Sequence, residues 1–260
     1  MNETFSTPTL RTTFKFPFQE KDWILPFVIG IALIFSGMIV PIIPVIFVYG
    51  YIAEVMRIAI KGEELILPQW KNWGKLFLDG IRCLGVALIY LGPGMLVSII
   101  GFMAYFLMLI ISIAISASSP SYNPTNSGLY ILTSFGAMAI LFISMALGTI
   151  LLFAGAIPLP AALANYIAHD KFGSAFHIRE WTKIIGRDKW GYLVAWLLMF
   201  GMISAAYLNF LITYWTFILC IFGFLLVYPV FFYILLISAT LFGQSYRQGA
   251  LLSAPNDPLI

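Results

Sequence analysis

Three long stretches of the chain contain no charged residue and no histidine. They run from Trp23 to Ala53, from Cys83 to Ala168 and from Trp190 to Tyr246, and they are 31, 86 and 57 residues long. All 14 lysines and arginines, all 11 acidic residues and both histidines lie outside them. Because a helix needs about 20 apolar residues to cross the hydrocarbon core of a bilayer, the three stretches predict several transmembrane helices.

The composition excludes the other broad classes of protein. Only 10% of the 260 residues are charged, against roughly a quarter in an average soluble domain. Two cysteines cannot form the framework of a small disulfide-rich protein, and an aromatic content of 17% argues against disorder. With a mean hydropathy of +0.96, the chain is expected to be an all-α integral membrane protein.

Proline and glycine clusters predict where the apolar helices break. They lie at Pro41–Pro44, Gly92–Gly94 and Pro158–Pro160, an uncharged polar loop is expected over 118–128, and a further boundary is expected near Asn209. A single kinked span across Pro41–Pro44 would reduce the number of spans from six to five. The six predicted spans cover residues 23–40, 44–61, 81–116, 129–157, 190–208 and 212–241, with the break at Gly92–Gly94 inside one crossing.

Two short amphipathic loops separate the charge-free stretches. In the first, residues 54–82, Asn72 is expected to cap a helix, and the spacing allows Glu54–Arg57 and Lys75–Asp79 ion pairs. The apolar face predicted for that helix consists of Trp73, Leu76, Phe77, Ile81 and Leu84, with Lys75, Asp79 and Arg82 on the opposite face. In the second loop, residues 169–189, Ser174 is the expected cap of a helix whose apolar face carries Ile178, Trp181 and Ile185.

Lysine and arginine predict the orientation of the chain in the membrane. Each loop carries five of them, whereas 118–128 carries none, so the positive-inside rule places both loops in the cytoplasm. We therefore expect an inner-membrane protein with both termini inside and no cleaved signal peptide. The predicted parts are a cytoplasmic interfacial tail (1–22), a single transmembrane domain (23–247) and a C-terminal tail (248–260).

One passage resembles a known family. It reads Val48-Tyr-Gly-Tyr51, Arg57, Gly62-Glu-Glu-Leu65, Leu67-Pro-Gln-Trp70 and Trp73-Gly-Lys-Leu-Phe-Leu-Asp-Gly80. This pattern is similar to that of an uncharacterised prokaryotic family of multi-pass membrane proteins, catalogued as domain of unknown function 4013. The layout also resembles, more loosely, the membrane domain of some glycerophosphodiester phosphodiesterases. Neither resemblance implies catalytic residues, and both imply the helical membrane topology.

The charge-free stretches offer no group for acid–base catalysis, since they contain no residue that titrates near neutral pH. Asn165 and Asn209 are their most polar side chains, and we expect each to bond a neighbouring helix rather than a substrate. His169, Asp170 and His177 could be considered as metal ligands, but zinc sites usually show tighter spacing. We therefore expect neither a metal nor another cofactor.

Three hypotheses of function follow. The first is a non-enzymatic module that binds partner proteins, another copy of itself or anionic lipids, and not nucleic acid. Its candidate contacts are the ten loop cations, which are Arg57, Lys61, Lys71, Lys75, Arg82, Lys171, Arg179, Lys183, Arg187 and Lys189. The second is a transporter of a neutral or apolar solute, built on the three helix breaks. The third is a lipid-headgroup enzyme that uses Glu54, Asp79, His169 or Asp170 at the cytoplasmic face.

Overall fold

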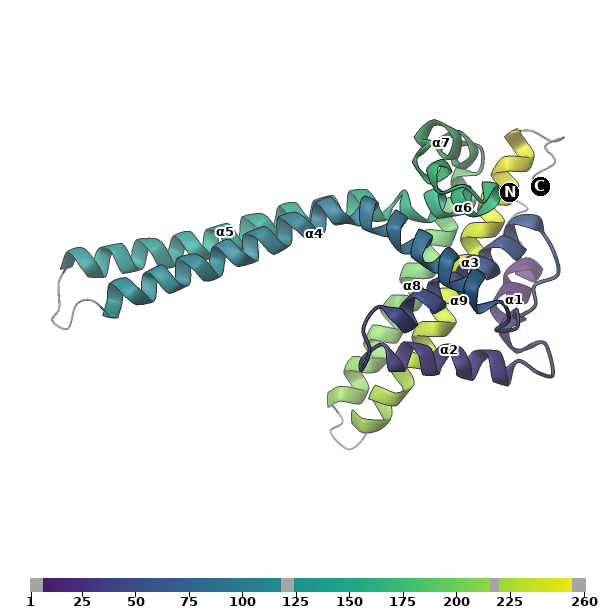
Figure 1. Ribbon diagram of the computed structural model, residues 1–260, viewed down its shortest axis with the longest axis horizontal. Coiled ribbons are helices and arrows are strands. Elements are labelled where there is room, and N and C mark those ends of the chain that lie inside the picture. The colour runs from purple at the N-terminus through teal and green to yellow at the C-terminus, as the bar shows by residue number, and fades with distance from the viewer. Residues whose placement is uncertain (1–6, 118–123, 216–219, 254–260) are drawn as a thin grey trace. The chain divides into compact units, whose positions relative to one another are not determined.

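A computed structural model describes residues 7–117, 124–215 and 220–253, and every regular element in these ranges is a helix (Figure 1). The prediction of an all-α protein is confirmed. The helices are α1 (Thr7–Lys15), η2 (Phe16–Phe18), α2 (Ile24–Ser36), α3 (Ile43–Lys61), α4 (Trp73–Ala117), α5 (Pro124–Ala156), α6 (Leu159–His169), η3 (Phe172–Phe176), α7 (Ile178–Arg187), α8 (Lys189–Trp215) and α9 (Cys220–Ser253).

Five of the described segments are long and apolar enough to cross a membrane. They are Ile43–Lys61, Trp73–Ala117, Gly128–His169, Lys189–Trp215 and Leu226–Ser253. The remaining predicted span, residues 23–40, corresponds to α2, which has only 13 residues. At 1.5 Å per residue α2 is about 20 Å long, shorter than the hydrocarbon core of about 30 Å. The chain is therefore a multi-pass membrane protein with five helices of spanning length and one shorter apolar helix.

The predicted helix breaks have different outcomes. Residues 37–42 separate α2 from α3, and a turn at Ile157 and Pro158 separates α5 from α6, so both of these breaks are confirmed. The break predicted at Gly92–Gly94 is wrong, because α4 continues through Pro93. A membrane helix tolerates a proline where the local backbone readjusts. The predicted loop over 118–128 is shorter than expected, since α5 already begins at Pro124, and residues 118–123 lie outside the described ranges.

The boundary predicted near Asn209 is also wrong. Helix α8 passes through this residue and ends at Trp215, and residues 216–219 lie outside the described ranges. Asn209 is exposed, and within the described residues its side chain makes no hydrogen bond to another helix. No proline or glycine stands next to Asn209, so a single amide side chain was too weak a signal to end an apolar helix.

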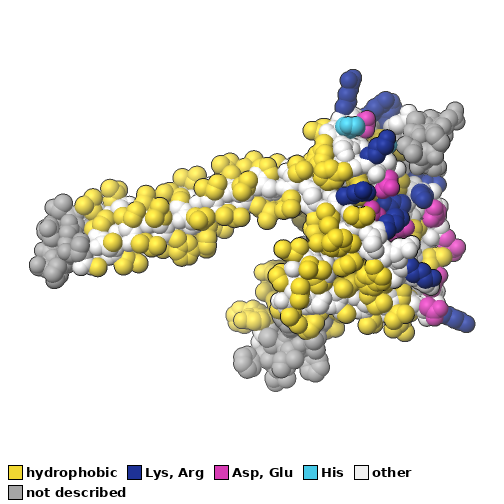
Figure 2. All heavy atoms as spheres, in the orientation of Figure 1, with side chains coloured by type: hydrophobic (Ala, Val, Ile, Leu, Met, Phe, Trp, Pro, Cys, Tyr) yellow, Lys and Arg dark blue, Asp and Glu magenta, His cyan; other side chains and the backbone are white. Residues whose placement is uncertain are grey.

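The chain divides into two compact units. Unit 1 comprises residues 1–86 and 160–260, and unit 2 comprises residues 87–159. Unit 2 is an antiparallel hairpin of the later part of α4 and α5. Its helices approach closely at glycines, since a Cβ atom on Gly155 would clash with the carbonyl oxygen of Tyr90, and one on Gly101 would clash with Ser144. Hydrophobic side chains cover the outer surface of this hairpin, as expected of helices that face lipid (Figure 2).

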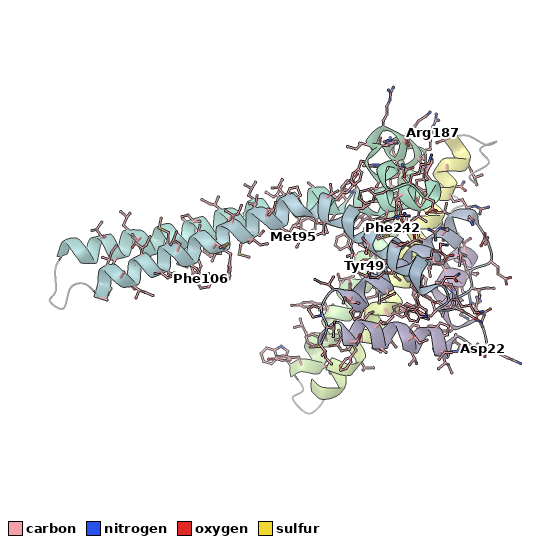
Figure 3. All side chains as sticks on the ribbon, in the orientation of Figure 1. Asp22, Tyr49, Met95, Phe106, Arg187 and Phe242 are labelled. Carbon is pink, nitrogen blue, oxygen red and sulfur yellow. The ribbon has the colours of Figure 1, made fainter. Side chains whose placement is uncertain are left out.

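Helix α9 forms the centre of unit 1. It packs against α3 and α8, and also against α2 and α7. Phe242 of α9 packs against two aromatic residues of α8, with its ring centroid 5.4 Å from that of Tyr192 and 5.5 Å from that of Trp196 (Figure 3). The fully buried side chains of α9 include Phe232, Leu236, Ile237 and Leu241. All the charged side chains that the structure describes belong to unit 1, and Figure 2 shows them gathered on one side of it.

Candidate functional site: an ion-pair cluster and a cavity

The guanidinium group of Arg57 lies at the centre of a buried ion-pair cluster. Arg57 is 9% exposed. Its two terminal nitrogens donate to the carboxylate of Glu54 and, over 3.0 Å, to Oδ2 of Asp79. Oδ1 of Asp170 lies 3.6 Å from Nη2 of the same arginine. The predicted Glu54–Arg57 pair is confirmed, and the cluster joins α3, the start of α4 and the residue that follows α6.

Two glycines allow this cluster to form, because they let the backbones of α3 and α4 touch. A Cβ atom on Gly50 of α3 would clash with the carbonyl oxygen of Leu76. A Cβ atom on Gly80 of α4 would clash with the carbonyl oxygen of Ile46. The close approach brings Asp79, the neighbour of Gly80, within reach of Arg57, which lies two turns beyond Gly50.

The prediction that Asp79 lies on the solvent-facing side of its helix is wrong. Asp79 is 3% exposed and pairs with Arg57, whereas its predicted partner Lys75 lies 3.1 Å from Glu54 instead. The buried stripe of this part of α4 consists of Leu76, Asp79, Gly80, Cys83 and Val86, while Trp73 and Ile81 of the predicted apolar face are exposed. Hydropathy alone missed this stripe, because an ion-paired aspartate and a glycine occupy two of its positions.

Tyr166 is a member of the cluster that the sequence did not single out as a site residue. It is completely buried in α6, and its hydroxyl group donates to Oδ1 of Asp79 over 3.2 Å. The second oxygen of the Asp79 carboxylate therefore also has a partner, as a buried carboxylate requires. No spacing signal along the chain connects Tyr166 with Asp79, since 87 residues separate them.

A cavity of about 280 Å³ lies beside the cluster. Its charged lining comes from Arg57, Lys61, Lys75 and Asp170, and its apolar lining from Ile60, Ile167 and Ala168. Lys61 is the last residue of α3, where Gly62 ends the helix with a φ of 68°. Left-handed backbone of this kind is what glycine provides at helix ends. The cavity is smaller than most drug-binding pockets.

The structure places the ten predicted contact residues in different environments. Arg57 is buried and Arg82 is half-buried, whereas the other eight are exposed. Three of them, Arg57, Lys61 and Lys75, line the cavity. A role in contacts with lipids or partner proteins stays a prediction for all ten.

Helix α7 carries an exposed row of cations, which we call the basic ridge. Arg179, Lys183 and Arg187 recur every four residues, and within the described part of the chain none of them has an acidic partner within 4.0 Å. Figure 3 labels Arg187 at the end of α7. Like charges at this spacing destabilise a helix by a few tenths of a kcal/mol per pair. The ridge is therefore a surface that an anionic partner would stabilise.

The apolar face predicted for α7 is only partly correct. Trp181 is buried, but Ile178 is 59% exposed. Ile184 contacts α9, since a Cβ atom on Gly249 would clash with its carbonyl oxygen. Ser174 does not cap α7, because it lies in η3 and the helix follows His177. Ile178 is the first residue of α7, which follows the short 3-10 helix η3.

Neither histidine is among the described residues that line the cavity, although His169 stands between Ala168 and Asp170 in the chain. Nδ1 of His169 lies 2.9 Å from the carbonyl oxygen of Asn165, and Nδ1 of His177 lies 3.2 Å from the carboxylate of Glu180. Among the residues that the structure describes, no three His, Cys, Asp or Glu side chains come together in a group that could hold a metal ion.

Asn165 forms the interhelical bond that the sequence predicts for it. It is completely buried, its Nδ2 donates to the carbonyl oxygen of Ser174 over 2.7 Å, and its Oδ1 accepts from the Tyr246 hydroxyl over 2.6 Å.

A second buried polar group, Asp188, was missed. It accepts from the backbone N–H of Gly191 and from Ser245. An aspartate three residues before Gly191, at the start of a helix, has the pattern of an N-cap.

Replacing Asn165 with alanine removes both of these buried hydrogen bonds. We expect Asn165→Ala to lower the free energy of unfolding by about 1–3 kcal/mol. The matched control is Asn209→Ala, whose side chain is exposed and which should change stability by less than about 0.5 kcal/mol. Thermal unfolding of both variants in the same detergent measures the difference, and equal melting temperatures would contradict the structural role of Asn165.

The comparisons with known proteins identify a family and no function. No curated protein matches the chain, and no solved structure matches it either. One family model matches residues 33–215, more than half of the chain, and its description is "Protein of unknown function (DUF4013)". The matched range contains the whole ion-pair cluster and every residue that lines the cavity. This chain therefore belongs to the DUF4013 family.

Proposed function

We propose that this chain is a non-enzymatic membrane module that binds a phospholipid headgroup in the cavity beside Arg57. The observation that carries the proposal is the cavity itself, whose lining brings together cations from α3 and α4. Arg57 is held by Glu54 and Asp79, whereas the ammonium groups of Lys61 and Lys75 belong to half-exposed side chains. Lysine is a good phosphate ligand because it offers a compact charge with three donors.

The position of the cavity along the helices supports a lipid as the ligand. Lys61 ends one segment of spanning length, Lys75 lies near the start of the next, and Asp170 directly follows the end of a third. The ends of transmembrane helices lie in the headgroup layer of the bilayer. We place this end in the cytoplasm, because both cation-rich loops belong to it.

The carboxylates near the cavity favour binding over catalysis. Asp79 is buried and already bonds Arg57 and Tyr166, and Glu54 bonds Arg57 and Lys75. A general acid or base must reach the proton that it transfers, and these two groups are engaged elsewhere. The enzyme hypothesis nevertheless gains one observation, because Glu54, Asp79 and Asp170 do converge around Arg57.

The transporter hypothesis loses part of its basis. It depends on three discontinuous helices, and α4 is continuous at Gly92–Gly94. The cavity described above lies at the ends of helices, whereas transporter sites lie near the midplane of the bilayer.

Lipid retention tests the proposal. The full chain is reconstituted in nanodiscs of mixed phospholipids, extracted into mild detergent, and examined by native mass spectrometry for bound lipid. The variant Lys61→Gln/Lys75→Gln removes both ammonium groups from the lining of the cavity. Each lysine contributes about 1 kcal/mol to the attraction of a phosphate-bearing membrane surface, so we expect the variant to retain about thirtyfold less lipid.

The matched control is Lys15→Gln/Lys21→Gln, which makes the same change of net charge at two exposed lysines outside the cavity. It should retain lipid like the wild type. Equal loss in both variants would show that only overall charge matters and would overturn the proposal. Release of a free headgroup by the wild type would overturn its non-enzymatic part and support the enzyme hypothesis.

A further inference from the structure

Each cation that lines the cavity already has a carboxylate neighbour. Arg57 pairs with Glu54 and Asp79, Lys75 pairs with Glu54, and Lys61 lies 3.7 Å from Glu63. The fourth charged residue of the lining, Asp170, is itself acidic. The cavity is therefore not a bare positive patch. A ligand with a net negative charge would meet carboxylates as well as cations, whereas a ligand that carries both signs would find a partner for each.

Asp170 is the acidic residue among the described residues that line the cavity. Its side chain is 67% exposed, and its separation of 3.6 Å from Arg57 is too long for a hydrogen bond. Within the described residues no group donates a hydrogen bond to this carboxylate. Ionised carboxylates accept several hydrogen bonds. The carboxylate of Asp170 therefore has room to accept them from a ligand in the cavity.

The backbone at Asp170 adds to this observation. Its φ is 53°, in the left-handed region, directly after the end of α6. Glycine or asparagine is the usual residue at such a helix end. Aspartate adopts this backbone conformation less readily than glycine or asparagine does. At this position it adds a carboxylate to the lining of the cavity.

We propose that the ligand carries a primary amine close to its phosphate, as a phosphoethanolamine headgroup does. This inference rests on the proposed function and specifies its ligand. The phosphate lies against Lys61 and Lys75, the ammonium group donates to Asp170, and the two carbons between them contact Ile167 and Ala168. All of these side chains line the same cavity.

The lining also discriminates against the other common headgroups. A choline headgroup has a quaternary ammonium with no N–H to donate, and proteins usually bind such groups with aromatic rings. None of the described residues that line the cavity is aromatic. A glycerol headgroup has no cation, so it would give Asp170 no hydrogen-bond donor with a positive charge and would bring the negative charge of the phosphate close to this carboxylate.

A competition experiment tests this specificity. The full chain is reconstituted in nanodiscs with equal parts of phosphatidylethanolamine, phosphatidylcholine and phosphatidylglycerol, and the retained lipids are counted by native mass spectrometry. For the wild type we expect phosphatidylethanolamine to be retained about tenfold over each of the other two, as expected from one charge-assisted hydrogen bond. In Asp170→Asn this preference should disappear.

Two further variants and one soluble probe make the outcomes distinct. Asparagine suits left-handed backbone, so Asp170→Asn should fold, and Asp170→Gly provides a second variant that removes the carboxylate. Glu64→Gln removes an exposed carboxylate outside the lining and should keep the preference. O-phosphoethanolamine serves as a water-soluble form of the same group. If phosphatidylethanolamine is retained in the presence of O-phosphoethanolamine, the ligand is the lipid. If O-phosphoethanolamine binds while no lipid is retained, the ligand is the soluble compound.

Separate results would overturn the inference and the proposed function. If the wild type retains the three lipids equally, and Lys61→Gln/Lys75→Gln retains less of all three, headgroup binding stands and the role of Asp170 is wrong. If Asp170→Asn still prefers phosphatidylethanolamine, the role of Asp170 is wrong as well. If Lys61→Gln/Lys75→Gln retains lipid like the wild type, the proposed function itself fails.

Discussion

Replacing Arg57 with methionine should lower the free energy of unfolding by about 3–5 kcal/mol. The substitution leaves Asp79, which is 3% exposed, without its cation. A buried charge that has lost its partner keeps the full cost of leaving water, and this cost exceeds what the pair contributes when it is intact. We expect a melting temperature in detergent well below that of the wild type.

Two further variants separate this effect from the loss of any positive charge. Lys61→Met breaks a pair with Glu63 in which both side chains are more than half exposed, so it should cost less than about 1 kcal/mol. In the double variant Arg57→Met/Asp79→Asn the unpaired carboxylate is gone, and stability should partly return. If the losses of stability in Arg57→Met and in Asp79→Asn alone add up exactly to the loss in the double variant, a coupled buried pair is contradicted.

Introducing one methyl group at Gly50 should also have a large effect. In Gly50→Ala the new Cβ would clash with the carbonyl oxygen of Leu76, which belongs to the backbone of α4 and cannot turn away. Overpacking of this kind typically costs about 1–3 kcal/mol. The two helices would have to separate, and their separation would also draw Asp79 away from Arg57. Gly80→Ala should behave in the same way, since its Cβ would meet the carbonyl oxygen of Ile46.

The same helix offers a matched control for these glycines. Gly74 lies in α4, and a Cβ atom there would have no neighbour within 4 Å. Gly74→Ala should therefore stabilise the protein by roughly 0.5–1 kcal/mol, because alanine loses less conformational freedom in a helix than glycine does. Thermal unfolding of the three variants measures the contrast. If Gly50→Ala melts at the same temperature as Gly74→Ala, the close contact between α3 and α4 is wrong.

The sequence could predict the membrane class and two of the helix breaks because these follow from local chemistry. Charge-free stretches require a bilayer, the prolines at Pro41–Pro44 mark the break between two helices, and the three-residue spacing of Glu54 and Arg57 allows an ion pair. Each of these features depends on residues that are neighbours in the chain. The turn before α6 at Pro158 belongs to the same group.

The candidate site could not be predicted in the same way, because its decisive contacts are long-range. Asp79 bonds Arg57 from 22 residues away and Tyr166 from 87 residues away. An acidic residue beside Lys75 and Arg82 has the pattern of a solvated face. Only the contact of α3 and α4 at Gly50 and Gly80 reveals that this face is buried.

The family motif acquires a structural explanation at this point. Tyr51 stacks on Trp70 with ring centroids 4.1 Å apart, and its hydroxyl group donates to the carbonyl oxygen of Pro68. These contacts fix the segment between α3 and α4. Arg57 lies in the helix before this segment, and Asp79 lies in the helix after it. The residues that carry the resemblance to the family are therefore those that hold the cluster and one wall of the cavity.

A cryo-electron microscopy structure of the full chain in nanodiscs that contain phosphatidylethanolamine tests the central claim most directly. Our account predicts α3 and α4 in backbone contact, Arg57 between Glu54 and Asp79, and headgroup density in the cavity within hydrogen-bonding distance of Lys61 and Lys75. A cavity that is closed by side chains, or one that stays empty while ordered lipids occupy other parts of the surface, would contradict it.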